Sequence, residues 1–143
     1  MKPLNEQHMV VLVDDEPAVL AALRRSLSRE PYLLLATDRP DQALCWVERM
    51  AVSAVVSDER MPDMTGRELL ARVSDRSPVT ARIILTAYGG PTAQLPRLGR
   101  SIECMIAKPW DDRMLRLALR EIMAERETLD PGRENDFERQ GAK

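Results

Sequence analysis

The sequence of 143 residues contains no long apolar run. A membrane-spanning helix needs roughly 18 or more consecutive apolar residues, and no stretch of this sequence approaches that length. The first eight residues, Met1 to His8, are polar and lack the apolar core of a signal peptide. We therefore expect a cytoplasmic protein that makes no contact with membranes.

Clustered positive charge and cysteine motifs are also missing. The chain has 21 Lys and Arg against 23 Asp and Glu, a formal net charge of −2, whereas nucleic-acid-binding surfaces are usually basic. We expect no direct contact with nucleic acid. The two cysteines, Cys45 and Cys104, have no metal-site or redox spacing, and they fit a reduced protein with two packed thiols.

The composition that is present suits one globular domain. Hydrophobic residues make up 44% of the chain and charged residues 31%, which is typical of a soluble domain with a real core. We assign residues 1–8 to an N-terminal lead and residues 9–127 to the domain. The polar residues 128–143 read as a tail or linker stub.

Short apolar runs alternate with helical patterns along the domain. Five runs read as strands, namely 8–13, 32–36, 55–58, 82–87 and 103–108. Helices are expected from Pro17, from about Pro40 with Asp38 or Asp41 as its cap, from about Gly66, and from Asp111 or Asp112. A short, bent helix is expected between Thr92 and Gly99, where Pro96 interrupts the pattern.

This alternation predicts an α/β fold. We expect a doubly wound, five-stranded parallel sheet of order 2-1-3-4-5, a (βα)5 arrangement with helices on both faces. In such a sheet the carboxyl ends of the strands share one edge, and ligands bind there at a topological switch point. The first and third strands are neighbours at that point.

Polar residues stand at four of the expected strand ends. Asp14 and Asp15 follow the first strand, Asp58 ends the third, Thr86 ends the fourth and Lys108 ends the fifth. Together they predict a constellation of three carboxylates, one hydroxyl and one ammonium group. Each pair of carboxylates at about 4 Å costs about 4 kcal/mol of repulsion at an effective dielectric constant near 20.

A magnesium ion would relieve this repulsion, because Mg²⁺ prefers oxygen ligands and binds through one or two carboxylates. A carboxylate can then attack a phosphoryl group and form an aspartyl phosphate. We expect Asp58 to be this nucleophile, Asp15 to bind the metal directly and Asp14 to bind it through water. Lys108 and Thr86 would interact with the oxygens of the transferring group.

The chain resembles the response-regulator receiver domains of two-component signalling, from about Met9 to Glu127. Four pieces carry the resemblance: VDDEP at 13–17, SDERMPDMTG at 57–66, LTA at 85–87 and KP at 108–109. The resemblance implies that a histidine kinase or a histidine phosphotransfer protein transfers a phosphoryl group to Asp58. It implies a signalling domain that catalyses only its own phosphorylation and dephosphorylation, and is not otherwise an enzyme.

The resemblance also implies finer features. The backbone carbonyl of Arg60 would complete the Mg²⁺ site, and the Lys108–Pro109 peptide bond would be cis. A downstream protein would bind the face formed by Pro91 to Glu127, with a homodimer left open. Receivers usually carry Tyr or Phe where this chain has Met105, so the switch that couples to Thr86 would be weaker.

Some relatives of this kind precede HD-GYP phosphodiesterase domains or belong to NtrC-like regulators, but no such domain is expected within these 143 residues. A haloacid-dehalogenase-like phosphatase with Asp58 as its nucleophile is the nearest enzymatic alternative. It needs a second carboxylate two residues after the nucleophile, where this chain has Arg60. A flavodoxin-like FMN site is disfavoured, because Asp14, Asp15 and Glu16 would repel the phosphate.

Overall fold

The computed structural model describes residues 8–87, 102 and 104–129. Its strands are β1 (His8–Val13), β2 (Tyr32–Thr37), β3 (Ala54–Asp58), β4 (Ala81–Thr86) and β5 (Cys104–Ala107). Its helices are α1 (Pro17–Ser26), α2 (Pro40–Arg49), α3 (Gly66–Arg76) and α4 (Asp112–Leu129). Within this part of the chain, no helix is both long and apolar enough to cross a membrane.

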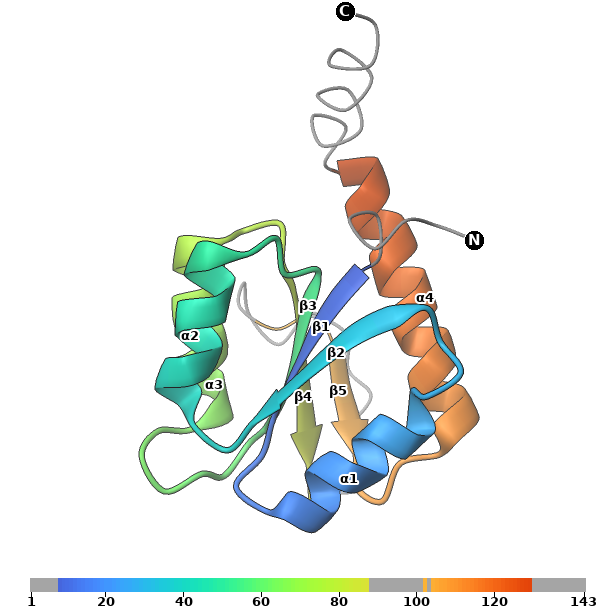
Figure 1. The fold of residues 1–143 in the computed structure, drawn as a ribbon, viewed down its shortest axis with the longest axis horizontal. Helices are drawn as coiled ribbons and strands as arrows, with labels where there is room; N and C mark the ends of the chain where they lie inside the picture. Colours follow the sequence, from blue (N-terminus) through green and yellow to red (C-terminus); the bar gives the residue numbers. More distant parts are fainter. Residues whose placement is uncertain (1–7, 88–101, 103, 130–143) are drawn as a thin grey trace, which may run out of the picture.

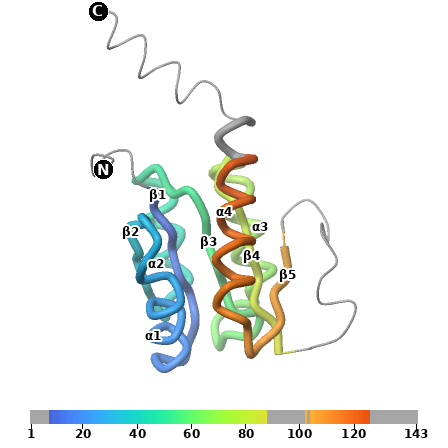
Figure 2. The backbone as a smooth tube through the Cα atoms, turned by 90° about the vertical axis from the view of Figure 1, so that its right-hand side faces the viewer, coloured from blue at the N-terminus to red at the C-terminus, as the bar shows by residue number. Residues whose placement is uncertain are grey.

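The five strands form one parallel sheet of order β2-β1-β3-β4-β5. Figure 2 shows the strands side by side in this order, and Figure 1 shows α2 and α3 on one side of the sheet with α1 and α4 on the other. The predicted doubly wound α/β architecture and its strand order are confirmed.

The alternation of side chains along each strand produces two separate cores. Val11 and Val13 of β1 face the core under α2 and α3, whereas Val10 and Leu12 face the core under α1 and α4. All four valine and leucine side chains are fully buried, and burial of such a side chain contributes about 1.5–3 kcal/mol. A sheet buried on both faces explains why its strands read as continuous apolar runs.

Proline fixes where the first two helices begin. Pro17 and Pro40 occupy the first turn of α1 and α2, where the missing N–H costs nothing. The expectation that Asp38 or Asp41 caps α2 was wrong. The N-cap is Arg39, in an extended conformation and without a side-chain cap bond, because the residue before a proline is held out of the helical region.

The later helices have side-chain caps. The hydroxyl of Thr65 accepts the backbone N–H of Glu68 at the start of α3. Asp111 accepts the backbone N–H groups of Arg113 and Met114, so α4 begins at Asp112.

Three of the expected segments fall partly or wholly outside the described residues. The bent helix predicted between Thr92 and Gly99 lies there, as do residues 1–7 of the lead and residues 130–143 of the tail. Helix α4 runs to Leu129, past the boundary expected at residue 127.

Candidate functional site

Strand register brings the predicted site residues to one edge of the sheet. Val13 pairs with Ser57 and therefore places Asp14 level with Asp58 on the neighbouring strand. Thr86 pairs with Ala107 and places Lys108 at the same edge. These strands are parallel, so their carboxyl ends meet, as the sequence predicted.

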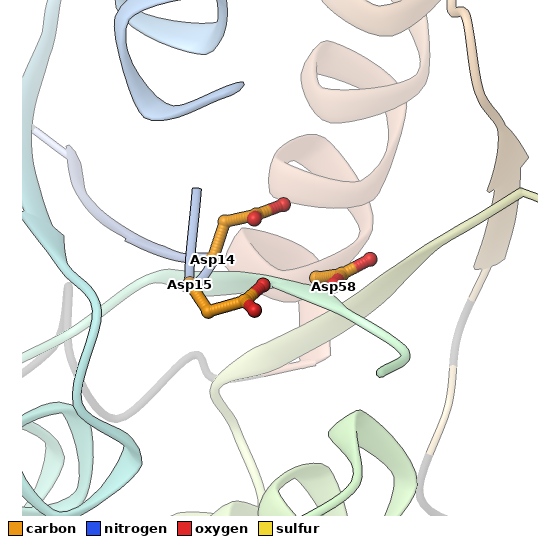
Figure 3. Close-up of side chains that lie close together, drawn as sticks. All are labelled: Asp14, Asp15 and Asp58. Atoms are coloured by element: carbon orange, nitrogen blue, oxygen red, sulfur yellow. The ribbon is translucent and has the colours of Figure 1, made fainter. Parts of the chain in front are cut away.

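Three carboxylates gather at this edge. Asp14, Asp15 and Asp58 each offer an oxygen, and these oxygens all lie within 4.8 Å of one another. Figure 3 shows the three side chains close together, with Asp14 and Asp15 following β1 and Asp58 at the end of β3. Asp14 and Asp58 are buried, whereas Asp15 is exposed. We name this group, with Lys108, the acidic cluster.

Lys108 bridges the two buried acids. Its Nζ donates to Asp58 Oδ1 at 2.8 Å and to Asp14 Oδ2 at 3.1 Å. Burial lowers the pKa of Lys108, but its contacts with Asp58 and Asp14 raise it more, and the net pKa is above its usual value. One ammonium group faces three carboxylates, so with all four groups ionised the cluster carries a formal charge of +1 − 3 = −2.

The pKa of Asp14 shows that Lys108 compensates only partly. Burial raises the pKa of Asp14 and outweighs the hydrogen bonds from Glu16 and Lys108, which lower it. The raised pKa of Lys108 alone would suggest a fully satisfied ion pair. The Asp14 carboxylate, however, has no exposed surface, and burial strongly disfavours an ionised acid, so Lys108 offsets only part of the cost of burying this charge.

The acidic cluster suits a hard divalent cation by its donor chemistry. All of its candidate ligand atoms are carboxylate oxygens, which Mg²⁺ and Ca²⁺ prefer. Both oxygens of Asp14 already accept hydrogen bonds, Oδ1 from the backbone N–H of Glu16 at 2.9 Å and Oδ2 from Lys108. Asp15 is exposed beside the cavity and is the less encumbered ligand.

A cavity of about 430 Å³ opens next to the acidic cluster. It is lined by Asp15, Glu16, Asp58, Glu59, Arg60, Thr86, Ala87 and Lys108. Four of the strand-end residues predicted from the sequence therefore line one cavity, and Arg60 lines it with them. Asp14 is not among the lining residues and is fully buried.

Gly66 allows α3 to begin directly against Asp58. A Cβ at Gly66 would lie 2.2 Å from the backbone oxygen of Asp58, far closer than any van der Waals contact. The N–H of Gly66 also donates to the backbone oxygen of Glu59 at 2.9 Å. Only glycine permits this close backbone approach, which fixes the loop that carries Asp58 into the site.

Glu59 is a site residue that sequence reasoning missed. Its carboxylate accepts hydrogen bonds from the side chains of Arg67 and Thr86. Burial raises the pKa of Glu59, but these two hydrogen bonds, together with the charges of Arg67 and Arg60, outweigh it and the net pKa lies below its usual value. The only sequence signal was an acid directly after Asp58, and nothing local indicated that it would contact β4.

The resemblance to receiver domains singled out two features of the fifth strand and its end. These are Met105, where receivers usually carry Tyr or Phe, and the Lys108–Pro109 peptide bond. Met105 is 8% exposed and packs in the core under α2 and α3, where its register partner is Ile84. The Lys108–Pro109 peptide bond is cis, the conformation that the resemblance implied. Thr86 lies opposite Ala107 in the register, so Met105 is not its strand partner.

Comparison with known families identifies this arrangement. The family model of the response regulator receiver domain matches residues 10–120. The chain belongs to this family. The match includes every residue of the acidic cluster, so the receiver resemblance inferred from the four motifs is confirmed.

Curated and solved relatives agree with the receiver assignment. The hydrogenase transcriptional regulatory protein HoxA of Cupriavidus necator is 35% identical over 74% of this chain and 22% of its own length. The DNA-binding transcriptional regulator NtrC of Proteus hauseri is 31% identical over 85% of this chain and 26% of its own length. The chain thus spans about a quarter or less of these relatives.

Among solved structures, the signal receiver domain of an HD domain-containing protein from Pseudomonas fluorescens is 32% identical with a TM-score of 0.76. This similarity covers 86% of the present chain and 99% of that domain. The similarity therefore covers nearly all of the solved receiver domain, and it is a similarity of sequence as well as of fold.

Proposed function

We propose that this receiver accepts a phosphoryl group on Asp58 from a histidine kinase or a histidine phosphotransfer protein, in a reaction that depends on Mg²⁺. The phosphorylated form then signals through altered binding of a partner protein. One observation carries the proposal: Asp58 lies in a cluster of three carboxylates, its oxygen is 2.8 Å from Lys108, and it lines an open cavity.

In the proposed reaction Asp58 is the nucleophile and Lys108 interacts with the transferring group. An Oδ of Asp58 attacks phosphorus and forms the new O–P bond, while the bond from phosphorus to the donor histidine nitrogen breaks and its electrons stay on the imidazole. Lys108 already lies beside Asp58 and can follow the oxygens of the incoming group. Its positive charge would offset the negative charge that the group brings.

Asp15 and Asp58 would hold the metal ion directly, Asp14 would hold it through water, and the backbone carbonyl of Arg60 would complete the site. When bound, Mg²⁺ would neutralise the charge of the carboxylates and of the phosphoryl oxygens. Asp14 suits an outer position because both of its oxygens already accept hydrogen bonds from the protein.

The test is labelling with a small phosphodonor such as acetyl phosphate in the presence of Mg²⁺. We expect one phosphoryl group per chain on wild type and none on Asp58→Ala. Equal labelling of Asp58→Ala would overturn the assignment. Sustained turnover of a generic phosphatase substrate would instead favour a haloacid-dehalogenase-like phosphatase, but no carboxylate follows Asp58 at the required position, which is Arg60.

For output we propose the face between Pro91 and Glu127. The structure describes residues 102 and 104–127 of this face, and the side chains of 102 and 104–125. On its described part, Met114 and Leu117 of α4 are exposed apolar residues, with 58% and 45% of their surface accessible. A partner that prefers the phosphorylated conformation would shift the population by its differential affinity. The net charge of −2 supports a protein partner and no direct nucleic-acid contact.

A further inference from the structure

The hydroxyl of Thr86 is already engaged before any phosphoryl group is present. Thr86 is 1% exposed at the end of β4, and its side chain is hydrogen-bonded to the carboxylate of Glu59. That carboxylate also accepts from Arg67 Nε at 2.9 Å. A threonine hydroxyl has a single proton and donates one hydrogen bond at a time.

The backbone of Glu59 is fixed on both sides. Its N–H donates to the backbone oxygen of Leu85 at 3.1 Å, and its carbonyl accepts from Gly66 at 2.9 Å. Only the side chain is therefore free to move between partners. Arg67 is 46% exposed on α3 and can keep hold of the carboxylate when Thr86 lets go.

We propose that Glu59 is a positioning residue that holds the Thr86 hydroxyl away from the phosphoryl site in the resting receiver. A phosphoryl group on Asp58 must take this hydroxyl from Glu59, because both are anionic acceptors that compete for one proton. The inference rests on the proposed function and deepens it. Glu59 sets how strongly phosphorylation is coupled to Thr86, and Arg67 keeps its hydrogen bond to Glu59 after Thr86 is released.

Beryllofluoride binding in the presence of Mg²⁺ tests the competition on the full chain. Removing the competitor in Glu59→Ala should tighten binding on the order of tenfold, about the worth of one hydrogen bond to a charged group. The gain should disappear when Thr86→Val is added, because Glu59 then has no hydroxyl to hold. Such non-additivity is the signature of two residues that act through each other.

Two variants distinguish the effect of the Glu59–Thr86 hydrogen bond from the effect of removing a negative charge near the site. Glu68→Ala removes an exposed acid from the first turn of α3 and should change affinity little. Glu59→Gln keeps an oxygen acceptor without the charge and should give an intermediate gain in beryllofluoride affinity. This variant replaces Glu59→Ala if Glu59→Ala does not fold. If Glu59→Ala raised beryllofluoride affinity equally in wild type and in the Thr86→Val background, the inference would be overturned and the proposed function would stay intact.

A second readout needs neither metal nor phosphoryl analogue. In metal-free protein, Glu59→Ala should shift the NMR resonances of the Thr86 methyl group, and Glu68→Ala should not. Unchanged Thr86 resonances in Glu59→Ala would overturn the inference. Failure of wild type to bind beryllofluoride, together with a failure to be phosphorylated, would instead overturn the proposed function on which it rests.

Discussion

Two polar clusters join distant parts of this chain, and their charges are balanced differently. The acidic cluster sets three carboxylates against one ammonium group. A second group, which we name the α1–α4 cluster, ties α1 and the turn after it to α4, elements that lie on the same side of the sheet in Figure 1. It consists of Ser26, Glu30, Trp110, Asp112 and Arg120.

The main ion pair of the α1–α4 cluster, between Glu30 and Arg120, is electrically neutral. Glu30 accepts two hydrogen bonds from Arg120, at 2.6 and 2.7 Å, and its side chain is 3% exposed. Trp110 Nε1 donates to the hydroxyl of Ser26 at 2.8 Å, and that hydroxyl bonds Asp112. The buried acid Glu30 is thus paired with a cation of the protein, and the second acid of the cluster, Asp112, is exposed to solvent.

We infer from this difference that the α1–α4 cluster stabilises the fold, whereas the acidic cluster, as proposed above, binds a cation and a phosphoryl group. A buried acid that is paired with its own arginine needs no external ligand, so loss of the Glu30–Arg120 pair should cost stability and leave the site chemistry intact. A group with excess negative charge is completed only by a cation and by the ligand that the cation recruits. Substitutions in the two clusters should therefore have opposite consequences, and the following predictions test this.

The largest expected effect is on phosphorylation. Asp58→Asn should abolish labelling while the free energy of unfolding stays the same or rises, because one of three crowded negative charges is removed. Chemical denaturation and labelling should be measured on the same preparation. A marked loss of stability would show that the acidic cluster holds the fold together, contrary to the comparison.

Next in size is the effect on the metal. Asp15→Asn should weaken Mg²⁺ binding more than Asp14→Asn does, because Asp15 is exposed beside the cavity and Asp14 already bonds Glu16 and Lys108. Loss of an outer ligand typically costs about 10- to 100-fold in affinity. Calorimetric titration of both variants checks the order, and the reverse order would contradict the assigned roles.

The α1–α4 cluster should respond in the opposite way. Arg120→Ala should lower the free energy of unfolding by clearly more than a control substitution on the same helix does, since it removes two hydrogen bonds from the buried carboxylate of Glu30. Labelling of Asp58 should not change. The matched control is Arg113→Ala, an exposed arginine on the same helix, which should alter stability by less than about 0.5 kcal/mol.

The smallest effect is a pH dependence of the same ion pair. The hydrogen bond with Arg120 lowers the pKa of Glu30 below its ordinary 4.5, although burial opposes this. Ionised Glu30 therefore stabilises the fold above that ordinary value, and the contribution is lost as the pH falls through the lower folded-state pKa. As the pH is lowered, the difference in free energy of unfolding between wild type and Glu30→Gln should become smaller. A difference that stays constant with pH would exclude this role of Glu30.

The acidic cluster was predictable from sequence, and the α1–α4 cluster was not. Strand ends are marked by apolar runs that stop at Asp14, Asp58 and Lys108, and parallel topology then forces those ends together. Glu30 and Arg120 are 90 residues apart, and neither lies in a periodic pattern that selects the other. Their pairing depends on how α4 docks, which no local signal encodes.

The same reasoning explains the two local errors. The position of Arg39 as N-cap follows from Pro40, a backbone constraint that outweighed the preference for aspartate. Glu59 was overlooked because its contact with Thr86 crosses from the loop after β3 to the end of β4. Sequence motifs predicted the polar residues at the strand ends, but not that Glu59 would bond one of them.

Thermal unfolding with Mg²⁺ and beryllofluoride is the most direct test of the claim that a cation and a phosphoryl group complete the acidic cluster. A ligand that binds only the folded state raises its stability. We predict a large rise in Tm for wild type when both are present, no such rise for Asp58→Asn, and a wild-type rise for Arg120→Ala from a lower starting Tm. Equal rises in wild type and Asp58→Asn, or none in wild type, would contradict the account.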